Sequence, residues 1–158
     1  MNDEKILGRL RELGIELPPP PAAVAAYLPC VVHGSFAFVA GQIAMTDGVV
    51  LHPGALGDGV SIDEGVDAAR QAALQALSAL RDVLGGSFER LERILQVTVF
   101  VACAPSFVDH PKVANGASEL LAEILGETGR HARAAAGVPS LPFGAPVELV
   151  MTAAVRAA

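Results

Sequence analysis

The stretch RHARAAAGVPSLPFGAPVELVMTAAV, residues 130–155, carries the pattern that decides the fold. It contains two extended runs joined by a Pro/Gly-rich turn, which predicts a hairpin. In the second run a spacing of two places Glu148 on the face opposite Val147 and Leu149. In the first run Arg133 is followed, up to residue 138, only by alanine, glycine and valine, so its guanidinium is the one strong anion-binding group there. One forked cation and one carboxylate therefore bracket the predicted hairpin.

Composition limits the classes of protein to consider. A chain of 158 residues with 52% hydrophobic and 18% charged residues fits one compact domain. The net charge of −6 and the lack of a Lys/Arg cluster argue against nucleic acid or an anionic membrane as a partner. Cys30 and Cys103 lie in apolar runs, as buried thiols of a reducing compartment do. With an acidic start and no apolar run of about 18 to 20 residues, the sequence predicts a cytoplasmic protein.

The amino-terminal residues predict a short helix followed by a connector. Apolar residues recur at near-helical spacing over residues 3–13, and Gly14 follows as a C-cap. Residues 17–21 include four consecutive prolines, which fix φ and remove backbone donors, so they predict an extended connector. We therefore divide the chain into residues 1–23, a helix and connector, and residues 24–158, the main domain.

The next segment predicts a β-hairpin. Residues 27–43 are rich in valine and phenylalanine, with Gly34 and Ser35 at the centre as the turn. Gly41 lies near the end of the second strand. A lone glycine there marks a bulge, or a place where another backbone or a ligand comes close. Gly41 is therefore a candidate for the lining of a ligand site.

Two long helices are expected in the middle of the chain. Ser61 and Glu64 form a capping box that begins the first helix, and Gly85 ends it. Pro111 suits the first turn of the second helix, which closes at Gly126. Both segments carry apolar stripes at helical spacing, which predicts that each helix packs against a core.

The order of elements predicts the fold class. A turn of helix over residues 88–93 and an alternating strand over residues 95–103 lie between the two helices. Strands, helix, strand, helix and strands in that order indicate an α+β fold, a mixed sheet with two long helices packed on one face. The other face would carry residues too apolar for solvent, which predicts a homo-oligomer: Phe100, Ala102, Val150 and Ala154.

Three segments together resemble the Rid/YjgF family of reactive-intermediate deaminases: YLPCVVHGSFAFVAGQ (27–42), VTVFVA (97–102) and HARAAAGVPSLPFGAPVELV (131–150). They share a tyrosine seven residues before a glycine, a strand that ends in Gly-Gln, and an arginine fifteen residues before a strand glutamate. The similarity covers about residues 24–155. It implies a chorismate-mutase-like α+β fold that assembles as a homotrimer, with a ligand cleft between neighbouring subunits.

The resemblance also implies roles for particular residues. Arg133 would hold the carboxylate of an imine or enamine acid, Glu148 would help to place a water, and Tyr27 would line the cleft. An arginine fork binds a planar carboxylate through two hydrogen bonds, and an imine carbon needs only a positioned water to release ammonia. Gly41 and His131, which shares a face with Arg133, are further candidates for substrate binding. No metal or cofactor is required by this chemistry.

Each of these candidates has a structural alternative. Arg133 and Glu148 could form an ion pair across an oligomer interface. Tyr27 could pack without touching a ligand, and His131 could be a satisfied structural histidine. The sequence also departs from the family pattern, since Ala134 stands where a small hydroxyl residue often follows the arginine. Transfer of the fold is therefore more secure than transfer of the activity.

The remaining nucleophiles and metal ligands point to no second site. Cys103 has no adjacent histidine or basic residue in sequence, which favours a buried small hydrophobe over a nucleophile. His33, His52 and His110 lack the spacing of metal ligands. Three functions remain: hydrolysis of small imine or enamine acids with release of ammonia, non-catalytic binding of small carboxylates by a trimer, and endoribonuclease activity. The acidic balance makes the last the weakest.

Overall fold

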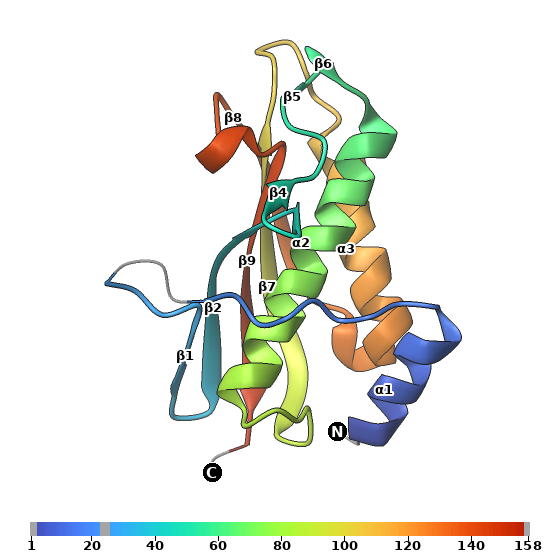
Figure 1. Ribbon diagram of the computed structural model, residues 1–158, viewed down its shortest axis with the longest axis vertical. Helices are drawn as coiled ribbons and strands as arrows, with labels where there is room; N and C mark the ends of the chain where they lie inside the picture. The colour runs from blue at the N-terminus through green and yellow to red at the C-terminus, as the bar shows by residue number, and fades with distance from the viewer. Residues whose placement is uncertain (1–2, 23–25, 157–158) are drawn as a thin grey trace.

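The computed structural model describes residues 3–22 and 26–156. Its first element is α1 (Asp3–Glu12), which confirms the predicted short helix. Ile6 and Leu10 are buried, and α1 contacts α3 (His110–Leu125). The connector then runs across the outer side of α2 (Ile62–Val83), as the blue trace in Figure 1 shows. The predicted domain boundary after residue 23 lies outside the described residues.

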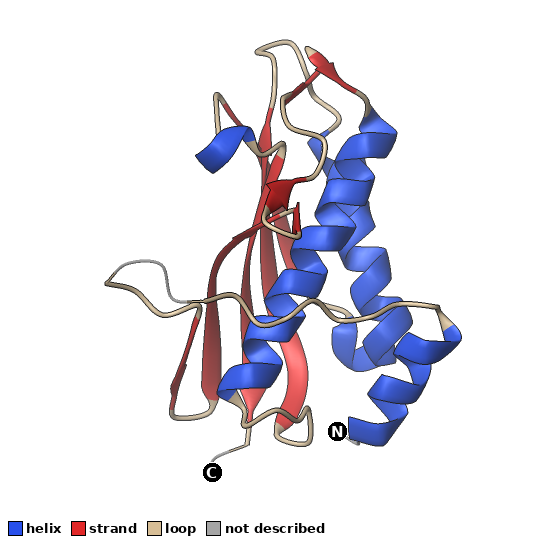
Figure 2. Cartoon of the chain, in the orientation of Figure 1, coloured by secondary structure: helices blue, strands red, loops and turns tan. Residues whose placement is uncertain are grey.

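The core of the fold is a five-stranded mixed sheet covered on one face by α2 and α3 (Figure 2). Within this sheet only the pair β7–β8 is parallel, so the predicted α+β class and mixed sheet are confirmed. In spatial order the strands are β1 (Cys30–His33), β2 (Phe36–Ile43), β9 (Val147–Val155), β7 (Leu91–Ala102) and β8 (Ala132–Val138). Two small pairs and two 3₁₀ turns lie outside the sheet: β3 (Met45–Thr46) with β4 (Val49–Val50), β5 (Ala55–Leu56) with β6 (Gly59–Val60), η1 (Gly126–Gly129) and η2 (Pro142–Gly144).

The helix boundaries follow the signals in the sequence. The capping box at the start of α2 is present: the Glu64 amide donates to Ser61 Oγ (3.3 Å), and the Ser61 amide donates to Glu64 Oε2 (2.8 Å). Asp109 is the N-cap residue of α3, and a proline occupies its first turn. Both helices bury their apolar faces against the sheet, where Val97 and Leu149 are fully buried.

The predicted hairpin within residues 130–155 is wrong. β8 runs parallel to β7, whereas β9 runs antiparallel to β7 on its other side, so β7 separates the two strands. The connection over residues 139–146 passes across the end of β7, and the Ala102 amide donates to the carbonyl of Pro146 (2.9 Å). A connection rich in proline and glycine is compatible with a hairpin and also with a crossing over the end of β7. Arg133 and Glu148 therefore lie on strands that do not touch.

The helical turn expected over residues 88–93 is also wrong, because β7 already begins at Leu91. Its pairing with β9 shifts register twice, between Leu91 and Arg93 and again between Ile94 and Gln96. Each bulge adds one residue to the strand. Apolar residues three apart, Leu91, Ile94 and Val97, therefore all face the core. In the sequence this spacing looks like that of a helix.

Apart from the 139–146 connection at one end, the described residues place no other element on the second face of the sheet. Val31, Phe36 and Phe38 on β1 and β2 are 45%, 47% and 49% exposed, respectively. Of the residues expected on this face, Phe100, Val150 and Ala154 are half-buried and Ala102 is buried. Ala102 is covered because the strand ends beneath the 139–146 connection. No helix among the described residues is long and apolar enough to span a membrane.

Candidate active site

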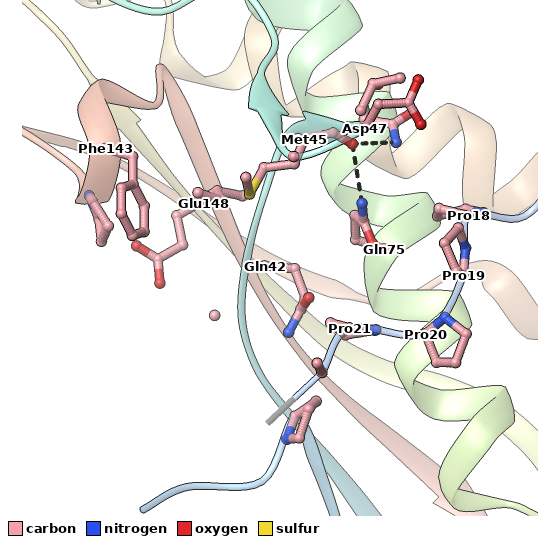
Figure 3. Close-up of a pocket in the computed structure, with 18 of the residues that line it drawn as sticks. Pro18, Pro19, Pro20, Pro21, Gln42, Met45, Asp47, Gln75, Phe143 and Glu148 are labelled. Carbon is pink, nitrogen blue, oxygen red and sulfur yellow. Dashed lines mark hydrogen bonds between the residues drawn. The ribbon is translucent and has the colours of Figure 1, made fainter. Parts of the chain in front are cut away.

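A cavity of about 970 Å³ opens beside residues 41–43 of β2, beyond Cys30, where β1 begins. Figure 3 shows Phe143 and Glu148 on one side, the prolines of the connector on the other, and Gln42 between them. The inner wall is held by α2, where the side-chain amides of Gln71 and Gln75 donate to the carbonyl of Met45 (2.9 and 3.0 Å). The cavity is therefore built from segments that are far apart in sequence.

Glu148 reaches this cavity through a close approach to Gly41. A Cβ atom placed on Gly41 would lie 2.8 Å from the carboxyl carbon of Glu148 and would overlap its Oε1. The register of β2 against β9 shifts between Val39 and Gln42, so Gly41 sits in a bulge. The predicted bulge is confirmed, and the side chain that comes close is Glu148. A ligand contact at Gly41 stays a prediction.

The carboxyl group of Glu148 sits in a partly desolvated position. The residue is half-buried, and burial raises the pKa of its carboxyl above the ordinary value. No cation of the described residues lies within ion-pairing distance of it. Glu148 can therefore take up a proton more readily than a fully solvated glutamate, and it has no charged partner among the residues that the structure describes.

Tyr27 lines the same cavity and is 54% exposed. The structure thus brings together three of the five predicted site residues: Tyr27, Gly41 and Glu148. Phe143 was not anticipated; it is 82% exposed and has a positive φ of 57°. Its only sequence signal is its position between Pro142 and Gly144, a pair typical of a tight turn.

Arg133 lies elsewhere, on the edge strand β8. Its Nη1 donates to Asn115 Oδ1 (2.9 Å) and to Ser118 Oγ (3.1 Å), both on α3. Nε and Nη2 have no partner among the described residues. Arg133 pairs in register with the buried Val97, on the helix-covered side, whereas Glu148 pairs with Phe100 on the other side. The two charged residues do not meet within one chain.

His131 lies beside Arg133 and is held by two hydrogen bonds. Its Nδ1 donates to the Gly129 carbonyl (2.7 Å), so in the neutral ring Nε2 accepts from the hydroxyl of Ser118 (3.1 Å). Burial lowers the pKa of His131, the Gly129 carbonyl opposes that shift, and the charge of Arg133 adds to it. A chain of hydrogen bonds therefore runs from Arg133 through Ser118 to His131.

Asn115 and Ser118 are functional candidates that the sequence analysis missed. They are three residues apart, so they share one face of α3. Their spacing on α3 was the available signal in the sequence. The residue to which they hydrogen-bond, Arg133, lies on another element, β8. Within the described part of the chain, no three His, Cys, Asp or Glu side chains are grouped as metal ligands would be.

Comparison with known proteins identifies the family. The family described as "YjgF/chorismate_mutase-like, putative endoribonuclease" matches residues 7–154. Protein TCP17 of Trypanosoma cruzi is 41% identical over 146 residues, which cover 92% of this chain and 91% of that protein. The crystal structure of Atu1372 from Agrobacterium tumefaciens, described there as of unknown function, has a TM-score of 0.91 at 38% identity and covers 97% of this chain and 94% of its own.

A crystal structure from Shewanella oneidensis MR-1 carries the same endoribonuclease label. It has a TM-score of 0.90 at 33% identity, and the match covers 95% of this chain and 99% of that one. The fold agrees with these two solved structures along nearly the whole chain. The protein belongs to the Rid/YjgF family.

Proposed function

We propose that the protein hydrolyses imines and enamines of 2-amino acids to 2-keto acids and ammonia. The proposed cleft combines the cavity of one subunit with Arg133 of a neighbouring subunit. The observation that carries this proposal is the separation of the two charged groups. Glu148 lines a cavity in which no described residue is a cation, and Arg133 presents its Nε and Nη2 at the opposite edge of the sheet.

This arrangement favours a ring of subunits. When a patch on one edge of a molecule meets a different patch on the other edge, the contact is heterologous, and it closes into a ring if the rotation allows. A homotrimer would also bury the exposed face that carries Val31, Phe36 and Phe38. Three copies of one cleft would then form, each with Arg133 from one subunit and Glu148 from the next.

Arg133 is suited to bind the substrate carboxylate. Asn115 and Ser118 occupy its Nη1, which fixes the plane of the guanidinium. The edge formed by Nε and Nη2 then remains for two parallel hydrogen bonds to a carboxylate. Binding at this edge would set the position of the imine carbon relative to Glu148 and hold it for attack by water.

Glu148 is suited to move the protons of the reaction. As water attacks the carbon of the protonated imine, one water proton passes to the Glu148 carboxylate and a neutral carbinolamine forms. Glu148 then returns this proton to the nitrogen, the C–N bond breaks and ammonia leaves, and the hydroxyl gives its proton to the Glu148 carboxylate as the keto group forms. The raised pKa of Glu148 brings it closer to neutral pH, where one group can both accept and donate a proton.

The cavity has room for a substrate with a side chain. Its 970 Å³ exceeds the roughly 300 Å³ at the small end of ligand pockets. On the side away from Glu148 the cavity is lined by Pro18 and Pro19, whose rings are apolar surfaces (Figure 3). We therefore expect imino acids derived from larger apolar amino acids to fit as well as the smallest ones.

The decisive experiment generates imino acids with an amino-acid oxidase in the presence of catalase and traps them with semicarbazide. An active protein diverts the imine to ammonia and lowers the yield of trapped product. Arg133→Lys should weaken binding of 2-keto acids by about 10- to 150-fold, since the lysine keeps the charge and loses the fork. Arg130→Lys is the matched control, because Arg130 is exposed and pairs with Glu127.

Glu148→Gln separates catalysis from binding. It is nearly isosteric, so it should keep the affinity for pyruvate and lose the acceleration of imine hydrolysis. If the unmodified protein binds pyruvate and never accelerates hydrolysis, the protein is the non-catalytic carboxylate-binding trimer instead. The endoribonuclease label of the relatives finds little support in a net charge of −6. Intact RNA after incubation is the expected result.

A further inference from the structure

Cys103 is paired with a histidine that the sequence did not predict for it. The Sγ atom of Cys103 lies 3.4 Å from Nε2 of His110, which is seven residues further along the chain. Both residues are half-buried, whereas Cys30, the other cysteine, is buried in the core. Cys103, which the sequence analysis expected to be a buried small hydrophobe, is therefore a partly accessible thiol, and the ring nitrogen of His110 beside it can accept a proton.

Three elements meet at this pair and hold it in place. Cys103 follows β7 on the side covered by α3, and its amide donates to the Val138 carbonyl of β8 (3.1 Å). His110 is the first residue of α3, and its ring makes an edge contact with Phe107 at a centroid distance of 5.4 Å. Gly137 of β8 provides the space, since a Cβ there would lie 2.8 Å from the sulfur.

We propose that Cys103 is a modification site for soft electrophiles, with His110 as the acceptor of the thiol proton. Thiolates are the reactive form of cysteine, and reactive cysteines occur where the thiol is partly exposed next to a histidine or another basic group. With an α-haloamide, the sulfur attacks the methylene carbon and the carbon–halogen bond breaks. The halide leaves with the bonding electrons, and the thiol proton passes to Nε2 of His110.

Cys103 lies away from the surfaces already assigned. It follows the buried Val101 by two residues, which places it on the helix-covered side of the sheet and not on the exposed apolar face. It does not line the cavity that contains Glu148. Formation of the proposed trimer and turnover in the cleft therefore do not require this thiol.

An adduct at Cys103 would disturb the support of Arg133. The sulfur is packed between Gly137 and His110, so an added group must push β8 and the start of α3 apart. β8 carries Arg133, and α3 carries its two hydrogen-bond partners. Modification would thus loosen both elements. Only the further effect on carboxylate binding rests on the proposed function.

Iodoacetamide is the probe for the site itself. Peptide mass spectrometry after timed labelling should show Cys103 modified long before Cys30, whose thiol is buried and has a pKa raised to about 11 by that burial. His110→Gln should slow labelling of Cys103 roughly tenfold, because the amide cannot accept the thiol proton. His33→Gln, a change of an exposed histidine on β1, should leave the rate unchanged.

Two results would overturn the assignment. Labelling of Cys103 no faster than that of Cys30 would mean that the thiol is closed to reagents. An unchanged rate in a folded His110→Gln variant, judged by its melting curve, would mean that His110 only packs there. As a check that needs no variant, the wild-type rate at Cys103 should exceed that of N-acetylcysteine at the same pH, and a slower rate would contradict activation.

Hydrogen exchange tests the structural consequence without any ligand. Labelled protein should exchange faster over residues 110–118 and 132–138, and Cys103→Ser treated in the same way should not. Unchanged exchange in fully labelled protein would refute the coupling. Pyruvate affinity is then measured on labelled wild type and on treated Cys103→Ser. If Arg133 binds the carboxylate, the affinity of the labelled wild type should be lower by about tenfold or more. If unlabelled protein does not bind pyruvate, the proposed function fails while the labelling result stands.

Discussion

The backbone of Gly41 lies directly against the carboxyl group of Glu148, on adjacent strands of the sheet. No side chain larger than hydrogen fits between them, because a Cβ would overlap the carboxylate oxygen. The bulge in β2 creates this contact at the wall of the cavity. The position of the carboxylate is thus set by a neighbour that has no side chain of its own.

Gly41→Ala should therefore displace Glu148 and lower imine hydrolysis by about 10- to 100-fold, since shifts near 1 Å in a reacting group have effects of that size. Steady-state ammonia release is the measurement, and pyruvate affinity should change little. Gly8→Ala in α1 is the matched control, because a Cβ there meets only the end of Arg11 at 3.8 Å. Full activity in Gly41→Ala would show that Glu148 need not occupy its present position.

Glu148→Gln should change how stability depends on pH. Burial raises the pKa of this carboxyl above 4.5, so the folded chain binds the proton more tightly than the unfolded chain. The free energy of unfolding of wild type therefore falls as pH rises from 4.5 through the raised pKa, and the Gln variant lacks this contribution. Urea unfolding at several pH values should show that the free energy of unfolding of the variant, relative to that of wild type, increases toward neutral pH. Parallel pH profiles would mean that the carboxyl is solvated.

His131 should affect the pH dependence of stability in the opposite sense to Glu148. Its pKa is lowered from 6.5 mainly by burial, so the unfolded chain takes up the proton first as pH falls. The stability contributed by the neutral ring is present above 6.5 and is lost as pH falls through the window below it. His131→Gln should flatten the unfolding free energy in that window, whereas His33→Gln should not. A slope that survives in His131→Gln would assign it to another group.

Phe38→Glu should prevent oligomer formation. Phe38 is 49% exposed on the apolar sheet face, and burying an unpaired carboxylate there would cost several kcal/mol. Light scattering should give three times the chain mass of 16.2 kDa for wild type and a single chain for the variant. Val49→Glu, at an exposed apolar residue on β4, is the control and should remain a trimer. A monomeric wild type would refute the shared cleft.

Much of the fold could be predicted because its signals are local. The capping box at Ser61 and the glycine that ends α3 act through neighbouring residues, and both helices appear where expected. The start of β7 was missed because bulges between Leu91 and Gln96 change the spacing of buried residues. The order of β8 and β9 was missed because a proline-rich connection does not reveal which strands it joins.

The site was predictable only in part, because contacts between distant elements leave no local signal in the sequence. Tyr27, Gly41 and Glu148 line one cavity of the chain, but nothing in the sequence connects Arg133 to Asn115. These contacts join elements that pack only after folding. The pairing of Cys103 with His110 also depends on where α3 begins relative to the end of β7. Tertiary packing, and not local propensity, decides such contacts.

The connector offers a test of substrate size. Ser78 of α2 is only 5% exposed, and its hydroxyl donates to the carbonyl of Pro18 (2.6 Å), which fixes the proline segment over the cavity. Ser78→Ala leaves that carbonyl without its partner, at a cost of about 1 to 3 kcal/mol. The proline side of the cavity should loosen, while Glu148 on the other side is unaffected.

Turnover of the imine derived from leucine should therefore fall in Ser78→Ala by a larger factor than turnover of the imine derived from alanine, which does not reach the prolines. The measurement is the ratio of kcat/KM for the two substrates, which cancels any uniform loss of folded protein. Ser106→Ala, at an exposed loop position, should leave the ratio unchanged. Equal losses for both imines would mean that the substrate side chain does not extend beneath the connector, and that the proline side of the cavity has no part in selecting the substrate.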